Sequence, residues 1–367
     1  MSDPVLSRRA LNRAALARQL LLDRVRLKIP AAVERIGGIQ AQLARPPFIG
    51  LWSRLAGFSR DDLARAVDRR EVVRGTLYRG TIHLVSRRDF LAFRPVVQES
   101  LAAAGNAIVG DRLGSLDLEA VLAAGRACFA ERPRPFDDAR AYLTRAFPKG
   151  DQRAMGYFVR MNLPLLQVPA AGAPWSYPSQ ADFALAESWL DEPVPAEGSA
   201  GALALRYFGA FGPASAADFQ TWSGLRAAPV LDVVRGKLRT FRTEEGRELF
   251  DLPTALRPDE DTPAPVRYLA QFDSLLLAYA DRSRIVPAAS KPLLASKNLM
   301  VPGTFLVDGF VAGRWDITGT KKKAVLALTP AGTLPRAVKD DLVAEGERLL
   351  RFAEPDVTTI SVAFSRA

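Results

Sequence analysis

The residues best suited to chemistry in this sequence are two glutamines, Gln40 and Gln42, which flank Ala41 shortly before the pair Pro46-Pro47. A carboxamide both accepts and donates hydrogen bonds, so two of them can hold and orient one water molecule. Side chains two residues apart share one side of an extended segment but lie about 200° apart on a helix. We therefore expect the pair at a place where a helix is ending.

A structural interpretation of the same pair is also open. One amide would cap backbone groups near Gly37-Gly38, where two glycines bend the chain, while the other is solvated. The two residue types alone favour this interpretation. A catalytic role is favoured only by the wider sequence context, described below.

The single histidine of the chain, His83, is interpreted as a structural residue. Its side chain titrates near neutral pH, which suits acid–base chemistry. However, it shares one face of a predicted strand with Thr81, whereas Ile82 and Leu84 face the core. We therefore expect His83 to anchor this strand, with substrate contact as the less favoured alternative.

Two aspartates late in the chain are alternatives to the amide pair, because a carboxylate can polarise an attacking water. Asp273 precedes an apolar run, and Asp281 lies beside Arg282 and Arg284. An ion pair that holds the last part of the chain in place is the commoner explanation for such a setting. We expect both aspartates to be structural first.

Composition favours a polyanionic partner and leaves few residues for metal chemistry. Fifty Lys and Arg residues against forty Asp and Glu give a formal net charge of +10, which is typical of proteins that bind nucleic acid. An arginine-rich proteome explains the charge equally well. One cysteine, Cys128, and one histidine exclude an internal disulfide and a Cys- or His-rich metal site. We expect no metal and no organic cofactor.

The sequence also lacks the signals of export and of membrane insertion. Its first residues include Arg8, Arg9 and Arg13 without an apolar core behind them, and no apolar run reaches the ~18 residues of a membrane span. We expect a cytoplasmic, nucleoid-associated protein with no membrane partner.

Basic side chains suited to contact a nucleic-acid backbone lie near the glutamine pair and on a predicted late hairpin. Arg and Lys neutralise phosphates and release counterions, so such contacts weaken with salt. Three successive lysines at a turn cannot all support a core, which makes the hairpin cluster the better supported. The candidates are Arg45, Arg54, Arg79, Lys321, Lys322 and Lys323.

The elements that must position these residues recur in units of helices followed by strands. Periodicity predicts helices over 11–27, from 31 toward Gly37-Gly38 and from 63, and then two short strands between Val72 and Val85. Two further units follow: helices 117–130 and 137–147 with strands 158–160 and 165–168, and helices 201–211 and 229–234 with strands 238–242 and 248–252. Helices followed by a small hairpin are typical of a winged helix.

After a proline-rich segment at 253–265, apolar strands at 301–310 and 325–328 predict a β-rich module with a basic hairpin. We therefore predict an α+β fold of tandem winged-helix (helix-turn-helix) domains followed by a C-terminal β-rich module. The predicted domains are 1–90, with the glutamine pair, 91–195, 196–257 and 258–367, with the hairpin. Tandem modules can cover a long partner without dimerisation, so we expect a monomer.

The sequence resembles the AlkZ/YcaQ family of bacterial winged-helix DNA glycosylases over nearly its whole length. The resemblance rests on the segments 35–42, 79–85 and 271–277, which read RIGGIQAQ, RGTIHLV and QFDSLLL. Members of the YcaQ type have an acidic residue in place of the second glutamine, so Gln42 makes the chain more similar to the AlkZ branch. The resemblance implies tandem winged helices in a C-shaped arrangement around a concave, DNA-sized cleft lined by Gln40 and Gln42.

The same resemblance implies a monofunctional DNA glycosylase that hydrolyses the N-glycosidic bond of N7-alkylated guanine. The substrates that the resemblance implies include interstrand crosslinks such as those of azinomycin-like agents. The partner would be double-stranded DNA carrying alkylated or crosslinked guanine, and Gln40 and Gln42 would position the attacking water. No lysine lies close to Gln40 in the sequence to form a Schiff base, so strand cleavage is not expected. Antibiotic self-resistance and general repair are both open as roles.

Winged-helix modules alone equally suit a non-catalytic DNA-binding protein, such as a transcription regulator. A regulator binds one sequence tightly and leaves alkylated DNA intact, whereas a glycosylase binds with little sequence preference and leaves abasic sites. A third and weaker hypothesis is a resistance protein that sequesters a free toxin and is indifferent to DNA.

Overall fold

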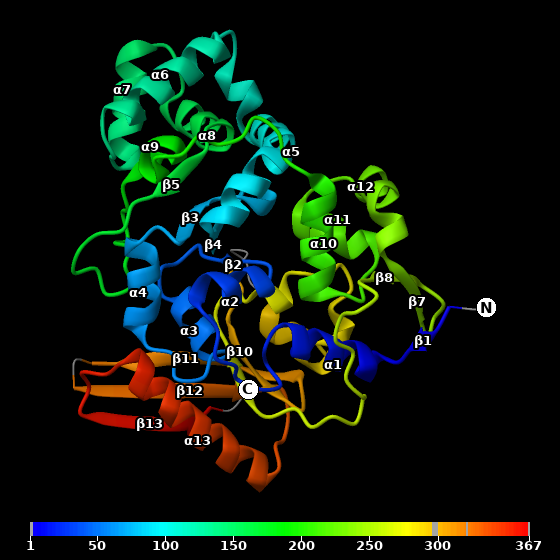
Figure 1. Cartoon of the computed structure of the whole chain (residues 1–367). Helices are drawn as coiled ribbons and strands as arrows, with labels where there is room; N and C mark the ends of the chain where they lie inside the picture. Colours follow the sequence, from blue (N-terminus) through cyan, green and yellow to red (C-terminus); the bar gives the residue numbers. More distant parts are fainter. Residues whose placement is uncertain (1–2, 296–299, 321, 366–367) are drawn as a thin grey trace.

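The computed structural model describes residues 3–295, 300–320 and 322–365 (Figure 1). Helical layers and three β-sheets make up this part of the chain, so the fold is α+β, as the sequence predicted. In Figure 1 the helices drawn in cyan and green lie at the top, the orange and red sheet lies at the bottom, and the blue N-terminal helices lie between them. Within the described residues, no helix has the length and apolar character needed to cross a membrane.

The first unit supplies the strand that carries Gln40. Ser7 and Ser59 begin two of its helices by accepting hydrogen bonds from backbone amides, and prolines stand in the first turn of two others, where a missing N–H leaves no bond unmade. Its elements are α1 (Arg8–Arg18), α2 (Ile29–Arg35), β2 (Ile39–Gln40), α3 (Pro46–Trp52), α4 (Arg60–Asp68), β3 (Val72–Thr76), η1 (Tyr78–Gly80) and β4 (Ile82–Ser86). The two strands predicted between Val72 and Val85 are confirmed as β3 and β4.

The second unit continues the sheet of the first. Its elements are α5 (Arg87–Leu113), α6 (Leu118–Glu131), α7 (Phe136–Ala146), α8 (Gln152–Asn162), β5 (Leu165–Gln167), β6 (Phe183–Leu185) and α9 (Ala186–Leu190). β3 pairs antiparallel with β5, with Arg74 opposite Gln167, and the strand order is β2-β4-β3-β5-β6. The hairpins predicted for two separate units therefore form one sheet, and the predicted boundary at residue 90 lies inside α5.

One predicted strand of this unit is wrong. Residues 158–160 lie within α8 rather than in a strand. Asp151 begins this helix by accepting from the amides of Arg153 and Ala154, and Ala154, Met155, Phe158 and Val159 are all buried. Their spacing of three and four residues is that of a helix face. A short apolar run containing Phe and Val is ambiguous between strand and helix, and the cap decides it.

The third unit incorporates the N-terminus. Its elements are α10 (Ala200–Phe211), α11 (Ala216–Ser223), α12 (Ala227–Val234), η2 (Arg235–Lys237), β7 (Arg239–Thr243) and β8 (Glu248–Asp251). Strand β1 (Val5–Leu6) pairs parallel with β7, which gives the order β1-β7-β8. Arg18 at the end of α1 forms a buried ion pair with Asp251 of β8, at 2.7 Å. The first residues of the chain therefore hold the first and third units together.

The C-terminal module is β-rich, as predicted. Its elements are β9 (Arg267–Leu269), β10 (Gly303–Val307), β11 (Phe310–Gly319), β12 (Lys323–Pro330), α13 (Arg336–Ala353) and β13 (Thr359–Phe364), with short 3-10 turns η3 (Ser274–Leu276), η4 (Arg282–Arg284) and η5 (Ala288–Leu294). The strand order is β13-β12-β11-β10-β9. The basic hairpin of the prediction is β11–β12, and α3 packs Ile49 into the core of this module.

Candidate active site

Two glycines direct the chain from α2 into the strand that carries the glutamine pair. Gly37 and Gly38 have φ angles of 77° and 86°, in the left-handed region that favours glycine. A Cβ atom at Gly38 would lie 2.9 Å from Cγ1 of Val85, so the turn also needs the missing side chain. Gln40 ends β2, and Gln42 lies in the loop that follows. The pair is therefore not on a regular helix, in agreement with what its spacing predicted.

Gln40 is buried and fixed by an arginine. Its side chain is 7% exposed, and its Oε1 accepts a hydrogen bond from Nη2 of Arg79 at 3.0 Å. Arg79 has a left-handed backbone (φ 55°) in η1, and its Nη1 donates to the carbonyl oxygen of Trp222 in α11. Burial lowers the pKa of the Arg79 guanidinium to about 10, so it stays charged at neutral pH. Arg79 thus links Gln40 to the third unit.

Gln42 is exposed and fixed by the backbone. Its Oε1 accepts from the amide of Ile82 at 3.0 Å, and the amide of Ala41 donates to the carbonyl oxygen of Ile82 at 2.7 Å. The side chain of Gln42 therefore continues the β2–β4 ladder beyond the end of the strand. This bond is of the backbone-capping kind that the structural interpretation of the pair describes, although the partner is Ile82 rather than the Gly37-Gly38 segment.

Arg74 supports the loop from strand β3, and sequence reasoning missed it. It is buried in the middle of β3, and its Nε and Nη2 donate to the carbonyl oxygen of Ala41 at 2.9 and 2.7 Å. Its Nη2 also lies 3.3 Å from the carbonyl oxygen of Gln42. Burial lowers the pKa of Arg74 to about 10. The sequence did contain a signal for a functional role of Arg74, namely a charged residue inside a predicted strand, between Val73 and Gly75.

The hydrogen bonds around the pair leave both amides able to bind a water molecule. An amide oxygen has two lone pairs, and each glutamine uses one of them, for Arg79 or for Ile82. In the part of the chain that the structure describes, neither Nε2 donates to a protein acceptor. Each amide therefore offers one acceptor position and its N–H donors in an orientation that the protein has already fixed. Such preorganisation is what positioning of an attacking water requires.

His83 is opposite Gln40 in the β2–β4 ladder and is uncharged at neutral pH. It is buried, its ring packs edge-on to Tyr78 at 5.0 Å, and its Nδ1 lies 3.1 Å from the carbonyl oxygen of Thr81. Burial, followed by the charge of Arg79, lowers its pKa to about 3. Because a carbonyl only accepts, Nδ1 carries the proton. This setting agrees with a residue that anchors the strand.

Arg54 must be removed from the set of DNA contacts predicted from the sequence. It is 2% exposed and donates two hydrogen bonds to the carboxylate of Asp273, at 2.9 and 2.8 Å. A fully buried guanidinium in a bidentate pair cannot reach a phosphate. The pair also gives Asp273 the structural role that was expected, and Asp281 has a similar role, since it lies 3.1 Å from Arg247 and caps the amide of Ser283.

The other predicted contacts differ in their accessibility. Arg45 immediately precedes α3, is partly exposed and pairs with Glu354 at 2.8 Å. Lys322 and Lys323 are exposed beside the β11–β12 turn, and Lys321 lies outside the described residues. Arg79 faces Gln40 and Trp222, as described above. Lys322 and Lys323 are therefore the most accessible of the candidates that the structure describes.

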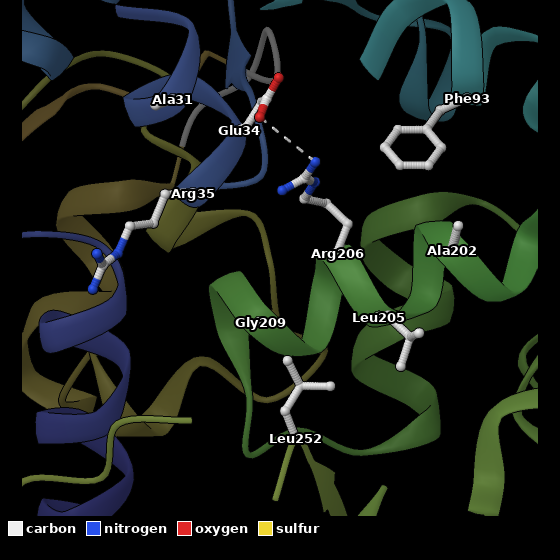
Figure 2. A pocket seen from close by; sticks show the side chains of 9 residues that line it. All are labelled: Ala31, Glu34, Arg35, Phe93, Ala202, Leu205, Arg206, Gly209 and Leu252. Carbon is white, nitrogen blue, oxygen red and sulfur yellow. Dashed lines mark ion pairs between the residues drawn. The ribbon is translucent and has the colours of Figure 1, made fainter. Parts of the chain in front are cut away.

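A cavity of about 590 Å³ lies between α2, α5 and α10. Figure 2 shows Glu34 and Arg206 pointing toward one another, with Phe93 beside them. The Glu34 and Arg206 side chains are 3.9 Å apart, and Arg206 also lies 2.8 Å from Asp89. These pairs connect the three helices. The lining of this cavity includes neither glutamine: Gln40 is buried in its strand, and Gln42 is exposed at the surface.

A basic α+β chain with tandem helical units and a preorganised amide pair fits an enzyme that acts on DNA, and comparison with known proteins defines the class. The chain matches the model of DNA glycosylase AlkZ-like proteins over residues 33–352 and belongs to this family of DNA glycosylases. DNA is accordingly its partner.

A solved structure extends the comparison to the fold. The Streptomyces sahachiroi DNA glycosylase AlkZ has a TM-score of 0.79 against this chain, with 98% of this chain and 100% of that chain covered. The sequence identity is 18%, so this likeness concerns the fold. Its extent agrees with tandem winged-helix units followed by a β-rich module. A search of curated protein sequences gave no significant match.

Proposed function

We propose that this DNA glycosylase is monofunctional and hydrolyses the N-glycosidic bond of N7-alkylated guanine without a metal or an organic cofactor. The observation that carries the proposal is the amide pair of Gln40 and Gln42, each with its oxygen fixed by a protein donor and its remaining hydrogen-bonding groups available. A glutamine at position 42 also supports a preference like that of the AlkZ branch.

The leaving group explains why two neutral amides are sufficient. Alkylation at N7 makes guanine cationic, so the electron pair of the C1′–N9 bond leaves with the base and the departing base is neutral. Such a leaving group needs little help from an acid. The neutral His83, with its pKa lowered to about 3, is consistent with a mechanism that uses no general acid at this position.

The remaining task is to deliver water to the sugar. As the C1′–N9 bond breaks, positive charge develops on the sugar, and the water held by Gln40 and Gln42 forms the new C1′–O bond. Its proton passes to solvent, and an abasic site remains. Arg74 and Arg79 keep the amides in place through the hydrogen bonds described above. Positioning of this kind lowers the entropic part of the barrier.

The exposure of Gln42 supports bulky substrates. Its side chain lies at the surface, next to the buried Gln40. A bulky or crosslinked guanine cannot be extruded into a tight pocket, so a site on an open surface suits it better. We therefore include interstrand crosslinks, such as those of azinomycin-like agents, among the proposed substrates. Arg45 and Lys321, Lys322 and Lys323 are proposed to contact the DNA backbone.

Single-turnover release of 7-methylguanine from a labelled duplex tests the proposal. The expected result is free base in the presence of EDTA and strand breaks that appear only after alkali, because a monofunctional enzyme leaves an intact abasic strand. The variant Gln42→Ala tests the role of the amide pair in this assay. The Gln42 side chain is exposed, so its loss should leave the fold in place.

Each of the following outcomes would reject one part of the proposed function. Strand breaks without alkali would show lyase activity, and loss of release in EDTA would show a required metal. Normal duplex binding with no release from 7-methylguanine or from crosslinked DNA would contradict the proposed substrates and favour a non-catalytic DNA-binding protein.

A further inference from the structure

A cavity of about 280 Å³ lies in the second unit, between α7, α8 and β6. Its lining combines three guanidinium groups with three aromatic rings. These residues are Arg140, Arg153, Arg160, Phe136, Tyr157 and Phe183, with Gly156 between them. No step of the proposed hydrolysis uses this cavity, which is called the arginine cavity below.

Positive charge exceeds negative charge in the arginine cavity. Arg140 pairs with Asp137 at 2.9 Å, but that carboxylate is 67% exposed and screened by solvent. Arg160 has a neutral partner, because its Nε donates to the hydroxyl of Thr76 at 3.3 Å. Burial lowers the pKa of Arg160. Arg153 is exposed at the start of α8. The cavity therefore attracts an anion.

A glycine inside α8 makes room for one of these arginines. A Cβ atom at Gly156 would lie 2.8 Å from Cγ of Arg140. Glycine inside a helix costs about 1 kcal/mol relative to alanine. Here it allows the stem of Arg140 to pass close to the α8 backbone and to bring its guanidinium to the lining of the cavity.

The arginine cavity is close to the amide pair. Thr76, which binds Arg160, is opposite Ile82 in the β3–β4 ladder. The amide of Ile82 in turn holds Oε1 of Gln42 at 3.0 Å. Opposite residues of antiparallel strands are about 5 Å apart. The pair of Thr76 and Ile82 therefore connects Arg160, in the lining of the cavity, with the backbone amide that fixes Gln42.

We propose that the arginine cavity binds one phosphodiester of the DNA strand that carries the lesion, with the aromatic rings in contact with the adjoining sugar or base. Guanidinium groups bind phosphate oxygens through paired hydrogen bonds, and aromatic rings stack on bases of any sequence. The volume lies just below the range of pockets for larger ligands, so it fits a single nucleotide unit. The inference rests on the proposed function, because that function places the lesion strand at Gln42.

The test compares duplexes in which one phosphate at a time, on either side of 7-methylguanine, is replaced by a neutral methylphosphonate. For the wild-type protein, the replacement at one position should weaken binding about tenfold. This factor corresponds to the free energy of one charged hydrogen bond. In Arg153→Gln the same replacement should have less than a twofold effect, and the dependence of log K on log salt should become shallower by about 1. Arg132→Gln, an exposed arginine at the end of α6, is the matched control and should keep the positional effect.

Two results would overturn the inference. One is an unchanged positional effect in both Arg153→Gln and Arg140→Gln. The other is saturable binding of inorganic phosphate that depends on these arginines while no methylphosphonate position matters, which would assign the cavity to a free anion. Base release is measured in parallel. Absence of release with a normal positional effect would contradict the proposed function alone, whereas normal release without the positional effect would contradict this inference alone.

Discussion

At the scale of single residues, the two glutamines differ in what their loss would do to the fold. Gln40 is buried, and its oxygen is a partner of the partly buried Arg79, whereas Gln42 is exposed and bonds to one backbone amide. Leaving a buried donor without a partner costs about 1–3 kcal/mol. Changes in activity at Gln42 are therefore easier to attribute to chemistry than changes at Gln40.

Replacing Gln42 with alanine is expected to lower the rate of base release about 10²-fold, because a positioned hydrogen-bonding group is lost in the transition state. The dissociation constant for DNA should change less than twofold. Single-turnover kinetics and binding titrations measure the two effects. Gln152→Ala, which removes an exposed glutamine at the start of α8, should alter neither.

Replacing Gln40 with alanine should reduce release by a similar factor and, in addition, lower the free energy of unfolding. Denaturant titration separates the two losses. Unchanged release in the double variant of Gln40 and Gln42, with folding intact, would remove the amide pair from the mechanism.

The buried histidine makes stability depend on pH in a defined direction. The folded-state pKa of His83 is about 3, below the unfolded value near 6.5. The unfolded chain therefore binds more protons between these values, so the stability contributed by neutral His83 is complete above about pH 6.5 and is lost as the pH falls toward 3. The slope reaches about 1.4 kcal/mol per pH unit. His83→Gln should flatten the pH dependence of unfolding in this window.

Because the chain has one histidine, its imidazole NMR signals report this residue directly. They should not shift between pH 8 and pH 5. A titration midpoint near 6.5 would show that His83 is accessible to solvent in the folded state and would contradict the structural role assigned to it.

At the scale of elements, helices were predicted well where the caps and turns that bound them lie in the sequence, but the helix predicted over 11–27 was wrong in its end, since α1 ends at Arg18. The helices α6, α7 and α10 begin and end within a residue or two of their predicted bounds, because caps, turns and apolar spacing lie within each segment. The strand predicted at 158–160 was wrong because this apolar run is too short to distinguish the two-residue period of a strand from the 3.6-residue period of a helix.

Long-range pairings were not predictable in the same way. Arg54 was expected to contact DNA, but its partner Asp273 lies 219 residues away in the sequence. The pairing of β3 with β5, which unites two units in one sheet, likewise depends on strands far apart in the chain. The glutamine motif was recognisable from its context, whereas the arginines that hold it, Arg74 and Arg79, depend on the tertiary fold for their role.

The β11–β12 hairpin is the element whose contribution to DNA binding is most accessible to test. Replacing Lys322 and Lys323 with glutamine should weaken binding to every duplex, damaged or not, and reduce the salt dependence by about 1 per lysine. Both side chains are exposed, so the fold should be retained. Lys339→Gln, on the neighbouring helix α13, is a matched control for charge. An unchanged salt dependence in the double variant would show that the hairpin does not contact phosphates.

At the scale of the whole molecule, one apolar cluster joins several of the predicted domains. A single cluster of buried side chains includes Leu16 of α1, Tyr78 of η1, Phe208 of α10, Leu275 of η3 and Val311 of β11. These residues come from the first unit, the third unit and the C-terminal module. Exposing one unit to water would expose apolar surface of the others, so the units are expected to unfold together.

This shared core predicts one cooperative transition in differential scanning calorimetry, with a calorimetric enthalpy equal to the van't Hoff enthalpy. The variant Asp251→Ala tests the coupling, because it leaves the buried Arg18 without its bidentate partner and should cost about 3–5 kcal/mol. The single transition should move to lower temperature without splitting. The double variant Arg18→Met, Asp251→Leu removes both charges of the buried pair and leaves only the partly exposed Arg257 without its carboxylate, so much of the loss should be recovered. A wild-type protein that melts in separate steps, or an Asp251→Ala variant in which only part of the heat shifts, would show that the first and third units are stable independently.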